Sequence, residues 1–91
     1  MLAVRLEIEG IVQGVGFRWW ARERARRLGL AGWVRNRPDG SVEIAVAGGS
    51  GEVEIFIDEV RDGPPGSRVD IVRRIALDAS QPLDKPFTIA R

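Results

Sequence analysis

The sequence predicts an α+β domain in which two helices cover one face of a single antiparallel or mixed β-sheet. Segments that alternate apolar and polar residues are interrupted by two segments of helical period, in the order strand, helix, strand, strand, helix, strand. Each helical segment has one apolar stripe, as packing on one face of a sheet requires. The chain has 91 residues and no internal repeat or linker, so one domain is expected over residues 1–91.

The first strand is predicted from Val4 through Val12, because apolar residues alternate there with charged ones. Residues 13–18 form a turn that contains two glycines. A helix is expected from Phe17 to Leu28, with Gly29 as its stop. Its apolar stripe consists of Phe17, Ala21, Ala25 and Leu28.

A hairpin is predicted next. The second strand runs from Leu30 to Asn36, and the third alternates apolar and other residues from Ser41 to Val46. Between them, the segment Pro38-Asp39-Gly40 fits a tight turn, in which proline fixes φ at the second position.

The second helix follows a glycine-rich break. Ser50 is the expected N-cap, with Glu52 and Glu54 in the positive first turn. The helix ends at the segment 62–66, which is rich in glycine and proline. Its stripe has spacing i, i+3, i+4 and i+7 and consists of Val53, Phe56, Ile57 and Val60.

The fourth strand is predicted from Val69 to Leu77, with a bulge near Val72 where the apolar phase changes. A loop follows from Ala79 to Lys85. Phe87 and Ile89 indicate a short last strand. This order fits a ferredoxin-like split βαβ sandwich, βαββαβ.

The composition of the chain excludes several kinds of catalytic chemistry. The chain has no cysteine and no histidine, which excludes disulfides, thiolate chemistry and the commonest general base and metal ligand. Its acidic residues are scattered, so no metal and no cofactor are expected. No apolar stretch approaches the roughly 20 residues needed to span a bilayer. Because no leader opens the chain, a cytoplasmic protein is expected.

The turn before the first helix is the candidate anion site. Gly14 and Gly16 can direct successive backbone N–H groups into one concave nest, and the helix N-terminus adds free N–H groups. Arg18, in the first helical turn, can fold a guanidinium over the same anion. The residues alone leave a second interpretation open, in which this is a tight strand-to-helix turn with Arg18 in solvent.

Several segments together resemble the acylphosphatase family over nearly the whole chain. The first signature of that family is matched by residues 10–18, GIVQGVGFR, and the second by residues 32–36, GWVRN. Three further matches follow in order: Pro38-Asp39-Gly40, Val42-Glu43-Ile44, and Gly63-Pro64-Pro65 with Val69.

The resemblance implies an enzyme that hydrolyses the carboxyl-phosphate anhydride of acyl phosphates to carboxylate and inorganic phosphate, without metal or cofactor. It implies that Arg18 is the catalytic, phosphate-binding arginine and that Asn36 orients the attacking water. The phosphate-binding loop implied by the match consists of the backbone N–H groups of Gln13, Gly14, Val15, Gly16, Phe17 and Arg18.

Two positions depart from the family pattern. Ile11 stands where the family often has a basic residue, which removes one charge near the substrate. Arg37 stands where a small or apolar residue is common, and it either adds a cation at the mouth of the site or points to water. The three tryptophans are expected to pack in the core, with one of them available to shape the acyl side.

Three other functions fit parts of the same pattern. The first helix carries five arginines and one glutamate, and ferredoxin-like domains often bind RNA, but the strands lack the aromatic pattern of such domains. Acylphosphatase-like domains also occur inside larger carbamoyl-transfer proteins of hydrogenase maturation, and an inactive relative is a third alternative. The expectation is a free-standing enzyme, monomeric, with an acyl phosphate as partner and neither nucleic acid nor membrane.

Overall fold

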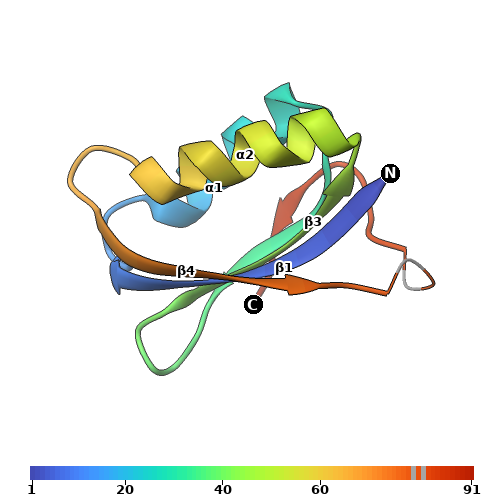
Figure 1. Cartoon of the computed structure of the whole chain (residues 1–91). Coiled ribbons are helices and arrows are strands. Elements are labelled where there is room, and N and C mark those ends of the chain that lie inside the picture. The colour runs from blue at the N-terminus through green and yellow to red at the C-terminus, as the bar shows by residue number, and fades with distance from the viewer. Residues whose placement is uncertain (79, 81) are drawn as a thin grey trace.

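The computed structural model describes residues 1–78, 80 and 82–91. Two helices lie on one face of a five-stranded sheet (Figure 1), which confirms the predicted ferredoxin-like α+β architecture. The elements are β1 (Leu2–Ile11), α1 (Phe17–Arg27), β2 (Ala31–Asn36), β3 (Val42–Gly48), α2 (Ser50–Asp62), β4 (Arg68–Ala76) and β5 (Thr88–Ile89). Neither α1 nor α2 is long and apolar enough to cross a membrane.

The sheet order determines where a site can form. The strands lie in the order β4-β1-β3-β2-β5; β1 is antiparallel to both β3 and β4, whereas β2 is antiparallel to β3 and parallel to β5. Since β1 and β2 both run antiparallel to β3, they are parallel to each other. Their C-terminal ends therefore lie at the same end of the sheet, although 25 positions separate Ile11 from Asn36 in the sequence.

The core fills the space between the sheet and the helices. The predicted stripe of α2 is buried in full, and Phe17, Ala21 and Ala25 of α1 are buried as well. Phe56 of α2 packs against Phe87, the residue before β5, with ring centroids 6.0 Å apart. Leu28 is half-buried because α1 ends at Arg27, one residue earlier than predicted.

The predicted N-cap of α2 is wrong. Gly49 is the cap, Ser50 is the first helical residue, and no side chain caps the helix. The carboxylate of Glu52 lies over Gly49, within 2.5 Å of the place where a Cβ would stand, so a larger residue at this position would have to displace the Glu52 side chain. Glu54 is not in the first turn either, and it pairs instead with Arg74 of β4 at 2.8 Å.

The predicted bulge of β4 exists but lies closer to the start of the strand. Glu9 faces Ile71 and Gly10 faces Val69, so Asp70 is the extra residue. Val69 and Val72 both pack against the core, three positions apart, which is why the apolar pattern changes phase before Val72. Within the predicted 79–85 loop, Ala79 and Gln81 lie outside the described residues.

The face opposite the helices is covered by paired charges at its centre. Alternation along the third strand predicts exposed polar residues there, yet Glu43 is only 6% exposed. Its carboxylate accepts hydrogen bonds from Arg5 at 2.9 Å and from Arg35 at 2.7 Å. The two arginine stems cover Glu43, and their donors satisfy both of its oxygens.

Candidate active site

The loop between β1 and α1 has a backbone that only glycine adopts readily. Gly14 and Gly16 have φ of 74° and 76°, and no described atom lies within 4 Å of where their Cβ atoms would stand. Both glycines are therefore required by the backbone conformation and not by crowding. Gly16 is the N-cap of α1, and no side chain in the described part of the chain caps this helix. The N–H groups of its first turn remain available to an anion.

Arg18 lies in that first turn, as predicted. It is exposed, and its guanidinium forms no hydrogen bond or ion pair with any residue that the structure describes. In contrast, Arg22 and Arg24 of the same helix pair with Glu23 and Glu59 at 3.2 and 3.7 Å. Arg18 thus has its donors free beside the uncapped helix end.

Asn36 is the last residue of β2 and lies on the helix-facing side of that strand, in phase with buried Val34. Its Oδ1 atom is buried and has no hydrogen-bond partner among the described residues. Leaving a buried acceptor unpaired costs about 1–3 kcal/mol, so such an atom in a cleft indicates a place for a water or a ligand donor.

A cleft of about 230 Å³ joins these parts. It brings together five residues of the predicted loop, Arg18 among them, with Asn36 from the parallel strand. Val15 does not line it, because its side chain packs against the core. Val12 and Ile89 also line the cleft and were not predicted as site residues, whereas Trp19 is the one tryptophan that lines it, as the sequence left open. The full lining is Val12, Gln13, Gly14, Gly16, Phe17, Arg18, Trp19, Asn36 and Ile89.

The tryptophans do not all pack in the core. Trp20 contacts Phe17 edge-on at 5.5 Å between centroids, and Trp33 stacks under Arg35 on the opposite face of the sheet. Trp19 is 59% exposed, which makes the packing prediction wrong for this residue. Phe17, Ala21 and Ala25 take the buried side of α1, so position 19, two residues after Phe17, faces away from the core, and Trp19 lines the cleft.

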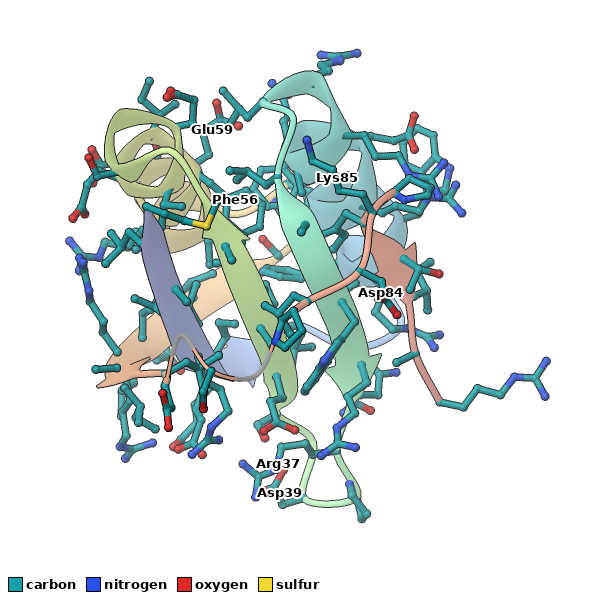
Figure 2. The ribbon with its side chains drawn as sticks, turned by 90° about the vertical axis from the view of Figure 1, so that its right-hand side faces the viewer. Arg37, Asp39, Phe56, Glu59, Asp84 and Lys85 are labelled. Carbon is teal, nitrogen blue, oxygen red and sulfur yellow. The ribbon has the colours of Figure 1, made fainter. Side chains whose placement is uncertain are left out.

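Arg37 follows neither predicted alternative. Its guanidinium donates to Glu7 of β1 at 3.0 Å, so it is neither a cation at the cleft nor free in water. Figure 2 shows Arg37 beside Asp39 at the turned end of the β2–β3 hairpin. Glu7 also accepts a hydrogen bond from Arg5 at 2.6 Å. The hydrogen bonds from Arg5 and then Arg37 lower the pKa of Glu7 below its usual 4.5.

Because the pKa of Glu7 is lowered in the folded protein, the contribution of Glu7 to stability depends on pH. A carboxylate whose pKa is lower in the folded than in the unfolded protein contributes stability above the unfolded value and loses it as the pH falls through the folded one. We therefore expect Glu7→Gln to lower the urea midpoint at about pH 7, and the difference from the parent to shrink below about pH 4. A difference that stays constant across this range would show that the Glu7 charge does not contribute.

A second cavity is less suited than this cleft to bind an anion. A larger hollow of about 650 Å³ lies at the opposite end of the sheet, and its wall is mostly apolar, with Met1 and Leu83 among its residues. It has no concentration of donors comparable to the loop. Within residues 1–78, 80 and 82–91, no three acidic side chains gather where they could hold a metal ion.

Comparisons with known proteins agree with the predicted resemblance. The model of the acylphosphatase family matches residues 4–89. An acylphosphatase of Rhizobium etli is 52% identical over 87 residues, which cover 94% of this chain and 93% of the relative. The crystal structure of acylphosphatase from Bacillus subtilis has a TM-score of 0.94 at 36% identity and is covered in full by this chain, as this chain is by it. Full-length HypF in its phosphate- and nucleotide-bound form matches 99% of this chain at 31% identity and a TM-score of 0.84, over 12% of its own length.

Proposed function

Because the chain belongs to the acylphosphatase family and is a hydrolase of acyl phosphates, we propose that it binds the phosphoryl group in the 13–18 loop with Arg18 and orients the attacking water with Asn36. The observation that carries these roles is the cleft itself. It joins the start of α1, the Arg18 guanidinium and the Oδ1 of Asn36, none of which has a side-chain partner among the residues that the structure describes.

The roles follow from the chemistry of each group. Hydrolysis of an acyl phosphate forms a bond from water oxygen to phosphorus and breaks the bond from phosphorus to the acyl oxygen. The electron pair leaves with a carboxylate, which is stable without a proton from the enzyme. The protein must mainly position the reactants and stabilise charge on the equatorial phosphoryl oxygens. The loop N–H groups and Arg18 supply fixed donors for those oxygens.

Asn36 suits the water better than the proton. Its amide cannot ionise near neutral pH, but Oδ1 can accept a hydrogen bond from water and so direct the water's lone pair toward phosphorus. The proton of the water then passes to an oxygen of the phosphate itself. Accordingly, the pH–rate profile is expected to lack an enzyme group with a pKa near about 6–7.

Hydrolysis of benzoyl phosphate by the purified protein, with a chelator present, tests the proposal. The expected result is turnover that the chelator does not change and that inorganic phosphate inhibits competitively. A folded protein that leaves benzoyl phosphate intact across buffers and pH would contradict it.

Trp19 gives the enzyme a preference for substrates with an aromatic acyl group. An exposed indole at the rim, next to Arg18, offers an apolar surface to the acyl group. Contacts between aromatic rings contribute about 0.5–1.5 kcal/mol beyond area burial, so Trp19→Ala is expected to lower kcat/KM for benzoyl phosphate by about 2- to 10-fold. The value for acetyl phosphate, which has no ring, should stay near the parent's.

The matched control is Trp33→Ala, which removes an indole from the opposite face of the sheet. It should leave the ratio of the two substrates unchanged. Equal losses for both substrates in Trp19→Ala would assign this residue to the structure of the loop and not to the acyl group.

We also propose that the protein is a cytoplasmic monomer that binds no nucleic acid. The chain has no cysteine, so an oxidising compartment would give it no disulfide. The large exposed apolar side chains within β1, α1, α2 and β4 occur singly, one on each element: Ile11, Trp19, Ile55 and Ile71. Three arginines of α1 bond within the protein, which weakens a nucleic-acid surface: Arg22 and Arg24 to acidic side chains and Arg26 to the carbonyl of Phe87.

A further inference from the structure

The side chain of Gln13 crosses from the loop to the β2–β3 hairpin. Its Nε2 donates to the backbone carbonyl of Arg37 at 2.9 Å and to that of Ser41 at 2.8 Å. These two residues close the hairpin, since the N–H of Arg37 also donates to the carbonyl of Ser41 at 2.9 Å. Both amide protons of Gln13 are therefore used, and both hold the base of one turn.

That turn begins directly after Asn36. The residues on either side of Asn36 are anchored on the opposite face of the sheet: Arg35 pairs with Glu43 at 2.7 Å and Arg37 with Glu7 at 3.0 Å. The end of β2 is thus held against β1 and β3. The bonds from Gln13 connect this anchored end to the segment that forms the phosphate loop.

We propose that Gln13 is a positioning residue, whose side chain sets the distance between the phosphate loop and Asn36 by bonding the loop to the hairpin. The inference rests on the proposed function. In-line attack requires one fixed position of the water relative to the phosphorus atom, but two separate segments of the chain hold the water and the phosphoryl group. Displacing reacting groups by about 1 Å can cost about 100-fold in rate. A side chain that bonds the two segments together prevents such displacement.

The chemistry of the side chain is specific to this role. An amide can donate two hydrogen bonds, whereas the two groups it meets are carbonyls, which only accept. A methionine has nearly the same length and volume but no donor. Gln13→Met therefore removes the two bonds with little change in packing.

The kinetic signature distinguishes positioning from binding. Gln13→Met is expected to lower kcat for benzoyl phosphate by about 10- to 100-fold. KM and inhibition by inorganic phosphate should stay near the parent's values, because the loop N–H groups and Arg18 remain. If phosphate inhibition weakens in step with kcat, Gln13 holds the loop's own shape and the inference is overturned.

A double-mutant cycle with Asn36→Ala supplies the second readout. If Gln13 acts by aligning Asn36 with the phosphate, then Gln13→Met costs little more once Asn36 is alanine. A merely structural role would multiply the two losses. Full multiplication would therefore also overturn the inference.

Two further variants keep the test decisive. Ser67→Ala is the control, because it also removes a side-chain bond to a carbonyl, that of Pro64 at 2.6 Å, in a turn that does not line the cleft. It should leave kcat unchanged. If Gln13→Met does not fold, Gln13→Asn, too short by one methylene to reach both carbonyls, should show the same loss in kcat alone. An inert parent would instead reject the proposed function, and an active parent with fully active Gln13 variants would reject this inference only.

Discussion

Replacing Arg18 with alanine is expected to lower kcat/KM for benzoyl phosphate by about 10³-fold or more. An arginine that stabilises the transition state of phosphoryl transfer contributes about 10³–10⁵ in other enzymes. Arg18 is placed for this, with its donors unpaired at the edge of the cleft. Inhibition by inorganic phosphate should weaken as well, because the same guanidinium binds the product in the proposed site. Initial rates over a range of substrate, with and without phosphate, measure both effects.

Arg18→Lys and Arg27→Ala are the controls for this prediction. Lysine keeps the charge but cannot form two parallel bonds, so Arg18→Lys should recover only part of the lost rate. Arg27 is also exposed on α1, at the end far from the cleft, and Arg27→Ala should leave the kinetics unchanged. Because Arg18 is exposed, its removal should change the free energy of unfolding by no more than about 0.5 kcal/mol. A folded Arg18→Ala protein with near-parental activity would exclude the proposed role.

Asn36→Ala carries the second large effect. Losing one positioned hydrogen-bonding group in a catalytic site costs about 10²–10³ in kcat, and we expect a loss of this size here. Inhibition by inorganic phosphate should change little, because the role proposed for Asn36 is to hold the water and not the phosphoryl group. This contrast with Arg18→Ala separates the two roles. Phosphate inhibition that weakened as strongly in Asn36→Ala as in Arg18→Ala would contradict this assignment of roles.

Stability gives an independent check on Asn36. Its buried Oδ1 accepts no hydrogen bond from any described residue, so the folded protein has no internal bond at this atom that its removal would break. Asn36→Ala removes that acceptor, so its urea midpoint should equal or exceed the parent's. A clear loss of stability would show that the amide has a structural role at the end of β2.

Much of the fold follows from local patterns. The stripe of α2 is predicted in full because each of its apolar residues lies at helical spacing and faces the sheet. The hairpin turn is predicted by proline and glycine at the positions that their backbone angles suit. The cap of α2 could not be predicted from residue preference alone, because Gly49 and Ser50 compete for it and the Glu52 carboxylate fills the space over Gly49.

The residues of the candidate site come from the sequence motifs, and the sheet topology explains why they lie together. Arg18 and Asn36 meet because β1 and β2 are parallel and end together, which the strand order implies. Other features depend on contacts between distant segments. The pairing of Arg37 with Glu7 spans 30 positions, and the bonds of Gln13 span 24 and 28, so no local pattern predicts them. The exposure of Trp19 could have been predicted, since it follows from the stripe of α1.

We propose that water held by Asn36 attacks phosphorus while the loop and Arg18 hold the phosphoryl group. Hydrolysis of benzoyl phosphate in water enriched in oxygen-18, followed by mass spectrometry of both products, tests it most directly. Attack of water at phosphorus places the label in inorganic phosphate and leaves the benzoate unlabelled. Label in the benzoate would mean that water attacks the acyl carbon, and it would contradict the proposed geometry of the site.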